Sequence, residues 1–529
     1  MTRWGMVADL ERCVGCQTCT ASCKHTNATP PSVQWRKVLD LEVGAYPDVK
    51  RVFVPVGCMH CEDPPCMHVC PSTATRQRAD GIVTIDYDLC IGCAYCAVAC
   101  PYQARYKVNG PTFAYGGRAG MKNEARREDP ARLGVAQKCT FCSDRVDYGL
   151  ANGLTPGIDH EASPACVNSC IAGALHFGDL KDPDSNVSRL LDTHQTFRMH
   201  AELGTEPGFH YIWKRKNNAG IDDEVEAPSL FSTGIGNVGG AAPWLQQHWD
   251  WRAAGNFIGG GTGSGLLAAI AVASFYAPLS FLYVLLALAF VGAGLFLVWL
   301  ETGRPWRAPL NVFFNPQTSW MSRESMVAGL LFPLAFVAGW FGTGPLLSVA
   351  ALVAMGFLYC QARLLKASKG IPAWRTPAIV RLIMTSGLCE GTGLLVAVGF
   401  LAPPVYAGLT TVLAVLLVLR LRSWRTYRKS LNGTAPDEAL RVIKTMSLPF
   451  GLFGHLLPII LIASGYLFVG AAPVVGALAG ICALAAGWWM KYMLVTKASY
   501  NQGYAINHTP ERGAGGGGAG GKPGWGMAS

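Results

Sequence analysis

Apolar residues are unevenly distributed along this chain, and their pattern divides it into two halves. Over residues 1–110 the apolar runs are short and β-rich, for example 51–56 and 81–85, and they alternate with cysteine-containing turns. From about residue 253 they form long runs, and most of these approach the ~20 residues that a helix needs to cross a bilayer. The eight long runs cover residues 253–275, 279–300, 325–342, 345–365, 377–399, 404–421, 447–469 and 472–494. We therefore expect an α+β domain followed by an all-α polytopic membrane bundle of eight helices.

Polar and glycine-rich segments set the expected boundaries. The predicted units are a cysteine-rich domain over 1–215, a linker over 216–252, a membrane domain over 253–500 and a disordered tail over 501–529. Residues 217–243 are rich in Gly, Ala and acidic side chains, and residues 513–529 are mostly glycine. Between linker and first run stand Trp244, Trp249 and Trp251. Tryptophans so placed favour a belt at the membrane interface, with a soluble aromatic cluster as the alternative.

The first long run is interrupted by five glycines, at positions 259, 260, 261, 263 and 265. In a membrane helix such glycines allow neighbouring backbones to approach closely. A phosphate-binding loop is not indicated, because no Lys-Ser/Thr follows.

Basic residues mark one side of the predicted bundle. The connections after the first, third, fifth and seventh runs are short and carry no Lys or Arg. The other connections and their flanks carry Arg304, Arg307, Arg323, Arg363, Lys366, Lys369, Arg375, Arg381, Arg420, Arg422, Arg425, Arg428, Lys429, Arg441 and Lys444. The positive-inside rule places them in the cytoplasm. We expect a bacterial-type inner membrane protein whose cysteine-rich domain and both termini lie on the cytoplasmic side.

Composition supports a chain that is part soluble and part membrane-embedded. Of its 529 residues, 15% are charged and 50% hydrophobic, and the formal net charge is +10. A basic chain can bind nucleic acid or an anionic membrane surface. Because the basic residues of the second half lie in loops between apolar runs, we expect a lipid bilayer as partner and no nucleic acid.

Sixteen of the 19 cysteines form four motifs in the first 170 residues. They are Cys13, Cys16, Cys19 and Cys23; Cys58, Cys61, Cys66 and Cys70; Cys90, Cys93, Cys96 and Cys100; and Cys139, Cys142, Cys166 and Cys170. A C-x2-C-x2-C turn wraps three thiolates around one [4Fe–4S] cube, and a fourth cysteine three residues later points to a neighbouring cube. Pro71 and Pro101 follow the second and third motifs, whereas Lys24 follows the first. Sixteen thiols suffice for four [4Fe–4S] clusters.

Two other uses of these cysteines are weaker. Zinc also binds C-x2-C pairs, and the split fourth motif is where zinc would fit best. A disulfide framework is not expected, because no charged and apolar leader opens the chain. Cys360, Cys389 and Cys482 lie in apolar runs and are expected to be small core residues.

The four motifs and the segment Ala174-Leu-His-Phe-Gly-Asp-Leu180 resemble the four-cluster iron–sulfur subunits of the dimethyl sulfoxide reductase superfamily. Polysulfide, tetrathionate and sulfite-oxidising complexes have similar subunits. The resemblance implies duplicated ferredoxin-like modules and a particular ligand pairing. The implied sets are Cys13, Cys16, Cys19 and Cys170; Cys23, Cys139, Cys142 and Cys166; Cys58, Cys61, Cys66 and Cys100; and Cys70, Cys90, Cys93 and Cys96.

The membrane half resembles the eight-helix anchor subunits of the same molybdoenzymes. The matching stretches are Glu301-Thr-Gly-Arg-Pro-Trp-Arg-Ala308, Thr318-Ser-Trp-Met-Ser-Arg-Glu324 and Ile371-Pro-Ala-Trp-Arg-Thr-Pro377. Anchors commonly have histidine where Glu301 stands, although a carboxylate can also exchange a proton. The chain thus looks like two fused subunits, and the resemblance implies a separate molybdenum catalytic partner.

A quinone site needs an apolar slot, proton-exchanging groups and a nearby cluster, which points to the cytoplasmic ends of the helices. The candidates are Glu301, Arg304, Arg307, Arg323 and Glu324; a solvated loop that binds lipid headgroups is the alternative. Glu390 lies inside the fifth run, where a carboxylate is either part of a proton path or paired with a polar neighbour. His455 is the only histidine in the apolar runs, so no haem with two histidine ligands is expected.

We therefore expect an electron-transfer and membrane-anchor protein that passes electrons from a molybdenum subunit to membrane quinone, as in sulfite oxidation. Such a chain would not act on the terminal substrate itself. The alternatives are the reverse flow, from quinol to a substrate such as dimethyl sulfoxide or polysulfide, a purely structural anchor, and a zinc protein.

Overall fold

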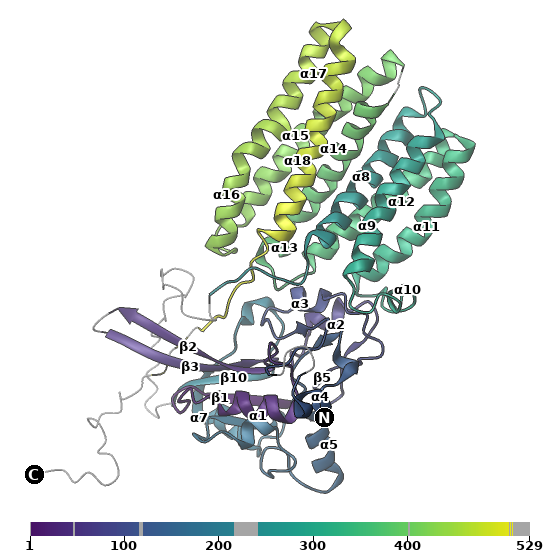
Figure 1. Ribbon diagram of the computed structural model, residues 1–529. Coiled ribbons are helices and arrows are strands. Elements are labelled where there is room, and N and C mark those ends of the chain that lie inside the picture. The colour runs from purple at the N-terminus through teal and green to yellow at the C-terminus, as the bar shows by residue number, and fades with distance from the viewer. Residues whose placement is uncertain are drawn as a thin grey trace, which may run out of the picture.

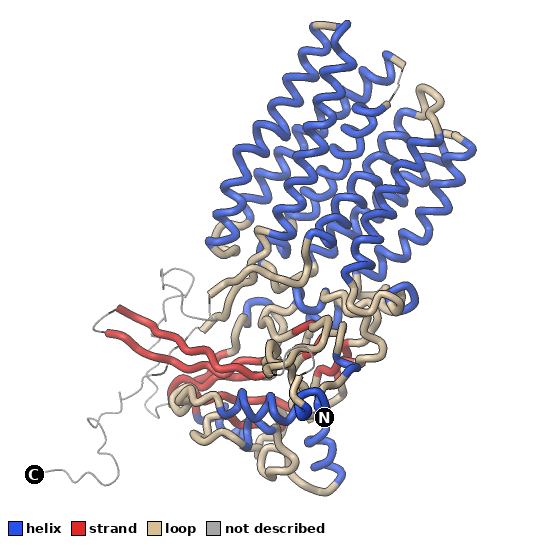
Figure 2. Tube along the Cα trace, in the orientation of Figure 1, coloured by secondary structure: helices blue, strands red, loops and turns tan. Residues whose placement is uncertain are grey.

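The computed structural model describes residues 2–45, 48–115, 120–215, 242–399, 402–506, 508 and 510. A cysteine-rich domain lies against one end of a bundle of long helices (Figure 1). Within the described residues the strands belong to the cysteine-rich part (Figure 2). The expected linker 217–243 and glycine-rich tail 513–529 lie almost entirely outside the described residues.

The cysteine-rich domain is built around a four-stranded sheet in the order β8-β1-β10-β9. The central strand β1 pairs parallel with β10 and antiparallel with β8. All six residues of β1 are buried, as expected for a central strand covered on both faces. Three two-stranded ribbons complete the domain. The strands are β1 (Trp4–Asp9), β2 (Arg36–Ala45), β3 (Asp48–Gly57), β4 (Thr75–Gln77), β5 (Val83–Ile85), β6 (Tyr106–Lys107), β7 (Ala136–Gln137), β8 (Leu175–Asp179), β9 (His194–Phe197) and β10 (Phe209–Arg215).

Short helices follow the cysteine turns, and two of these turns share a backbone geometry. In the first turn Gly15 and Gln17 have φ of 71° and 61°; in the third, Gly92 and Ala94 have φ of 70° and 58°. Non-glycine residues seldom adopt this left-handed region, so its repetition indicates a duplicated module. The helical segments are α1 (Thr18–Asn27), α2 (Pro65–His68), α3 (Tyr95–Ala99), α4 (Lys122–Arg127), η2 (Pro130–Arg132), α5 (Ser143–Ala151), α6 (Ala165–Asn168), α7 (Asn186–Thr193) and η3 (Ala201–Leu203).

Among the described residues of the second half, eight helical segments are long and apolar enough to cross a membrane, which confirms the predicted number. They are α8 (Trp251–Ala273), α9 (Phe281–Glu301), α11 (Trp320–Phe341), α12 (Gly344–Lys366), α14 (Ala378–Val398), α15 (Pro403–Ser430), Asp437–Leu467 and Val469–Thr496. The seventh comprises α16 (Asp437–Gly451), a π-helical turn η4 (Leu452–Leu456) and α17 (Leu457–Leu467). The eighth comprises η5 (Val469–Ala471) and α18 (Ala472–Thr496). Two short helices, α10 (Ala308–Asn311) and α13 (Pro372–Arg375), face the cysteine-rich domain (Figure 1).

Helix α8 is the central helix of the bundle, and its glycines allow the neighbouring helices to pack closely against it. A Cβ atom on Gly263 would lie 2.5 Å from the carbonyl oxygen of Ala287 on α9, and one on Gly265 would lie 1.9 Å from that of Gly387 on α14. Side chains at these positions would therefore push the neighbouring backbones apart. This close packing is the role that the glycine run predicts.

Two expectations at the ends of the membrane domain are corrected. Trp249 does not face lipid: it is 4% exposed and stacks on Trp374 with ring centroids 5.5 Å apart. Residues 501–506, expected in the disordered tail, pack on the cysteine-rich domain, where Tyr504 and Ile506 are buried. Both corrections have one cause, because the docked domain covers aromatic and apolar side chains that sequence alone leaves at an open membrane surface.

The packing of α8 makes a prediction about stability. Gly265→Leu should lower the free energy of unfolding by about 3 kcal/mol, at the upper end of measured overpacking costs. The matched control is Gly408→Ala on α15, where a Cβ meets no atom within 4 Å. That variant should be neutral or gain about 0.5 kcal/mol from reduced backbone entropy of the unfolded chain. Thermal unfolding of both variants in detergent tests this, and equal stability would contradict the packing argument.

Candidate functional site

The fold gathers the sixteen motif cysteines into four sets of four. Burial raises the pKa of Cys61, and the thiolates of Cys58, Cys66 and Cys100 raise it further. In the same way, the neighbours of Cys23 are Cys139, Cys166 and Cys142. The neighbours of Cys93 are Cys96, Cys70 and Cys90. The last set, Cys13, Cys16, Cys19 and Cys170, lines one cavity. These are the sets that the family resemblance implies.

The four sets follow one another in a line. Beyond the larger effect of burial, neighbouring sets lie close enough for the thiolate of one to raise the pKa of a cysteine in the next. Cys19 of the first set raises the pKa of Cys166 in the second. Cys58 of the third set raises the pKa of Cys139 in the second, and Cys96 of the fourth raises the pKa of Cys66 in the third. The order is therefore Cys13 set, Cys23 set, Cys58 set, Cys70 set. Cys16 of the first set is exposed, whereas the fourth set lies against the helical bundle.

Buried cations stand between the sets. Arg105 donates a hydrogen bond from Nη2 to Sγ of Cys66 over 2.9 Å. Burial alone would lower the pKa of Arg105, but the thiolates of Cys66 and Cys96 outweigh it and raise that pKa. Arg36 is 1% exposed beside Cys166 and Cys139, and its Nε and Nη1 have no protein partner. Unpaired buried donors are costly, so this site fits an anionic group with further acceptors.

The donor set fits iron–sulfur clusters. Each of the four irons of a [4Fe–4S] cube binds its own thiolate, so the four sulfur atoms need not converge on a point. Within the described ranges no three His, Cys, Asp or Glu side chains are placed to hold one metal ion. Arg36, Arg105 and Lys138, all buried, would offset the negative charge of such clusters.

The fourth set is joined to the bundle through three glycines, Gly92, Gly134 and Gly303, which we call the glycine junction. A Cβ on Gly92 would lie 1.9 Å from O of Gly134, and one on Gly134 would lie 2.3 Å from O of Gly303. Backbone hydrogen bonds of 3.1 Å run from N of Gly303 to O of Gly92 and from N of Arg304 to O of Ile91. The loop that carries Cys93 therefore contacts the end of α9 directly.

A narrow cavity separates Cys93 from two carboxylates of the helices. Its lining residues are Cys93, Trp249, Ala253, Asn256, Phe257, Val298, Glu301, Thr302, Met321, Glu324 and Leu364. Trp249 Nε1 donates to O of Cys93 over 3.1 Å and forms one wall. The cavity offers about 20 Å³, which is close to one water molecule.

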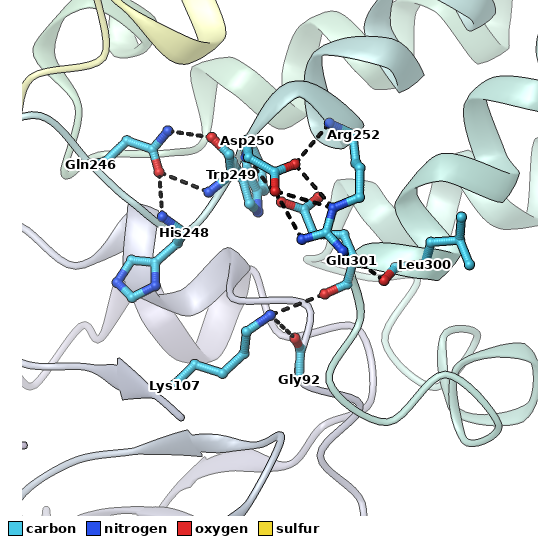
Figure 3. Close-up of polar contacts among 9 residues, drawn as sticks. All are labelled: Gly92, Lys107, Gln246, His248, Trp249, Asp250, Arg252, Leu300 and Glu301. Carbon is cyan, nitrogen blue, oxygen red and sulfur yellow. Dashed lines mark hydrogen bonds and ion pairs between the residues drawn. The ribbon is translucent and has the colours of Figure 1, made fainter. Parts of the chain in front are cut away.

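Glu301 is 6% exposed at the end of α9 and is held by the segment that precedes α8 (Figure 3). The backbone N of Asp250 donates to its Oε1 over 3.2 Å. The carboxylate of Asp250 pairs with Arg252 at 2.9 Å. Lys107 donates to the carbonyl oxygens of Gly92 and Glu301 over 3.1 and 3.0 Å, and its burial lowers its pKa. These contacts place a buried carboxylate between solvent-facing charges and the cavity.

Glu324 lies on α11 on the other side of the cavity and is 3% exposed. Asn256 of α8 donates from Nδ2 to its Oε1 over 3.1 Å, and the amide of Gln361 on α12 lies beside it. Two of the six predicted candidates, Glu301 and Glu324, thus meet at one cavity next to Cys93.

The three candidate arginines do not line this cavity. Arg304 donates to O of Leu133 and O of Pro130, both over 2.9 Å. Arg307 donates to O of Tyr87 over 2.7 Å and lies 3.6 Å from Asp88. Both therefore bind the cysteine-rich domain to the bundle. Arg323 donates to O of Pro316 over 2.8 Å and lies 4.3 Å above the ring of Trp320.

Glu390 is fully buried in the bundle and pairs with Lys491 of α18, with Nζ 2.8 Å from Oε2. Of the two expected roles for Glu390, the structure shows the pairing. His455 is hydrogen-bonded within the bundle: its Nδ1 lies 2.8 Å from O of Phe450, and Nε of Arg420 lies 3.2 Å from its Nε2.

Sequence reasoning missed Trp249, Asn256, Gln361 and Lys491 as site residues. A lysine inside an apolar run was a readable signal for Lys491, because such a charge needs a partner. Asn256 and Gln361 also stand in or beside apolar runs, but nothing local indicates that α8 and α12 bring them to Glu324.

A domain that gathers sixteen cysteines beside buried cations, docked on helices long enough to cross a bilayer, defines a membrane-attached iron–sulfur electron-transfer protein. The family model described as "4Fe-4S dicluster domain" matches residues 49–113. A selenate reductase subunit from Mesobacillus selenatarsenatis is 39% identical over 226 residues, which cover 40% of this chain and 72% of that protein. A sulfite dehydrogenase subunit from Allochromatium vinosum is 36% identical over 240 residues, covering 42% and 88%.

A tetrathionate reductase subunit from Salmonella typhimurium is 38% identical over 232 residues, covering 43% of this chain and 76% of that protein. The chain belongs to the family of iron–sulfur subunits of dimethyl sulfoxide reductase-type molybdoenzymes. In this chain the iron–sulfur part is continuous with eight membrane-capable helices.

Arg105 makes a testable prediction about the cluster sites. A buried cation stabilises the reduced, more negative form of a neighbouring cluster. Arg105→Gln should therefore lower the midpoint potential of the third or fourth cluster by roughly 60 mV, the equivalent of about 1.4 kcal/mol for one electron. Redox titration followed by electron paramagnetic resonance measures this. Arg189→Gln, on the exposed side of α7, is the control; an unchanged potential in Arg105→Gln would contradict the charge argument.

Proposed function

We propose that this chain carries electrons through four [4Fe–4S] clusters between a molybdenum catalytic subunit and membrane quinone, and anchors that subunit to the membrane. Each set of four cysteines would hold one cluster. Iron–sulfur clusters transfer single electrons, whereas a quinone takes two electrons and two protons. The quinone step is the part of the chemistry that this chain would perform itself.

One observation carries the proposal: Cys93 of the fourth set lines the same cavity as Glu301 and Glu324. A cluster at Cys93 would supply electrons at one wall, and the two carboxylates would exchange protons at the other. Apolar walls of Ala253, Phe257 and Val298 suit a quinone ring. A purely structural anchor would not need two buried carboxylates at this point.

The cavity must widen to admit a quinone ring, and its lining includes the flexible side chain of Met321. Methionine has three rotatable bonds and adapts to irregular space. A wider cavity of about 870 Å³ lies between α15, α17 and α18, near Tyr406 and Tyr466. None of its lining residues is a cysteine of the four sets, so it does not adjoin a cluster site as the cavity beside Cys93 does.

The first set would face the catalytic partner, because Cys16 is exposed and lies furthest along the line from the bundle. We propose electron flow toward quinone, driven by a substrate such as sulfite; one relative is part of a sulfite dehydrogenase. Other relatives are parts of selenate and tetrathionate reductases, for which flow would be reversed. The basic connections lie on the side of the cysteine-rich domain, which supports a cytoplasmic location for that domain.

The carboxylates give the most direct test. Glu324→Gln and Glu301→Gln keep the side-chain shape but remove the exchangeable proton, so quinone-linked turnover should fall about a hundredfold. Reduction of the clusters by dithionite should be unchanged. Glu438→Gln, which changes a half-buried carboxylate on α16 that pairs with Arg441, is the control. If both variants turn over quinone at the wild-type rate, the two carboxylates do not take part in the quinone step.

Electron direction can be measured on the purified chain. For quinone reduction we expect the fourth cluster to titrate at or below the quinone couple. A potential more than roughly 120 mV above that couple, an unfavourable factor of about a hundred per electron, would instead support quinol oxidation.

A further inference from the structure

The ion pair of Glu390 and Lys491 lies deep in the helical bundle, and both side chains are 0% exposed. Besides the 2.8 Å contact with Lys491, the Glu390 carboxylate accepts hydrogen bonds from Thr262 over 3.0 Å and Ser386 over 2.9 Å. Glu390 and Thr262 stand near the middle of α14 and α8. Charges at such depth are costly and mark functional positions more often than structural ones.

The pair is not electrically balanced by its surroundings. Arg420 of α15 is also fully buried, and it lies close enough to Lys491 and Cys389 for its positive charge to influence both electrostatically. Arg420 donates to Ala483 O, Gly454 O and His455 Nε2, so in the described bundle none of its hydrogen-bond partners is a carboxylate. Two cations therefore share one anion. Release of a single proton from Lys491 would remove the surplus positive charge.

A column of polar groups connects the pair with the cavity beside Cys93. Lys491 donates to O of Phe257 over 2.8 Å, next in the chain to Asn256. Gln361 donates to O of Asn256 over 3.0 Å, and Asn256 donates to Glu324 over 3.1 Å. Glu324 in turn lines the cavity. Groups from α8, α11, α12 and α18 thus form one buried polar route.

Buried oxygen atoms without a protein partner occur along this route. They are Oδ1 of Asn256 and Oε1 of Gln361. Leaving a buried acceptor unpaired costs about 1–3 kcal/mol, and ordered water commonly satisfies it. These acceptors therefore mark positions at which water would bridge the amide groups and complete a path for protons.

The glycines of α8 and α18 make room for the column. A Cβ on Gly260 would lie 2.3 Å from Nε2 of Gln361, and one on Gly261 would lie 2.0 Å from Nζ of Lys491. A Cβ on Gly487 would lie 2.5 Å from Oε1 of Glu390. The glycine run thus serves this route as well as backbone packing.

We propose that the Glu390–Lys491 pair is a proton site that exchanges protons with the quinone cavity through Glu324, Asn256, Gln361 and ordered water. The inference rests on the proposed function, since quinone is the group that consumes the protons. Quinone takes two electrons from the clusters and two protons, one from Glu324 and one from Glu301, which both line the cavity. The Glu324 carboxylate is then reprotonated along the column, and the ammonium of Lys491 becomes a neutral amine. Lys491 recovers its proton from solvent after quinol has left.

Infrared difference spectroscopy of the full chain with bound ubiquinone analogue tests this, comparing the oxidised state with the state after quinone reduction. Loss of the Lys491 proton should shift the carboxylate band of Glu390. We expect that band change in the wild type and its loss in the double variant Glu390→Gln, Lys491→Met. The double variant removes both charges, so neither remains buried without its partner.

A second variant tests the route. Gln361→Leu leaves the pair intact but breaks the column, and the band change should develop about a hundredfold more slowly. Ser348→Ala on the same helix is the control. If the wild type reduces quinone without the band change, or if the double variant shows the same band change as the wild type, this inference is wrong but the proposed function still stands. A wild type whose reduced clusters do not reduce quinone would overturn the proposed function and with it this inference.

Discussion

Close contact between the Cys93 loop and the end of α9 is the constraint on which the rest of this structure depends. Gly92, Gly134 and Gly303 come from distant parts of the chain, yet their backbones approach so closely that no Cβ atom would fit between them. The hydrogen bonds from Gly303 and Arg304 to the Cys93 loop use this approach. Any larger residue in the glycine junction would move the fourth cysteine set away from the two carboxylates of the cavity.

Buried charge is handled differently in the two halves. In the cysteine-rich domain the sixteen thiols are accompanied by Arg36, Arg105 and Lys138, which are buried among them. These buried cations require anionic clusters to compensate their charge, because isolated buried charges are very costly. In the bundle, Glu390, Lys491 and Arg420 leave a net positive charge. An excess of this kind favours the release of a proton, which suits a neighbouring reaction that consumes protons.

The C-terminal segment links both halves. After α18 the chain returns to the cysteine-rich domain, where Gln502 donates to O of Pro101 over 3.4 Å and Tyr504 is buried. The backbone N of Asn501 donates a hydrogen bond to the carbonyl oxygen of Trp244, which precedes the first membrane helix. The segments before and after the bundle therefore lie side by side and fasten the domain to it. Glycine or charge patterns in the sequence give no sign of this, because Tyr504 and Ile506 are single apolar residues in a polar stretch.

The sequence by itself determined the features that depend on local periodicity and spacing. Run length gave the eight helices, cysteine spacing gave iron–sulfur chemistry, and the lopsided connections placed the basic residues on the domain's side of the bundle. Their position at the predicted cytoplasmic ends of the helices made Glu301 and Glu324 candidates for a quinone site. Only the tertiary structure brought these two carboxylates to Cys93, assigned Arg304 and Arg307 to docking, buried Trp249 and paired Glu390 with Lys491. Each of these depends on contacts between residues far apart in the chain, and such contacts follow from how domain and helices pack, which no local pattern specifies.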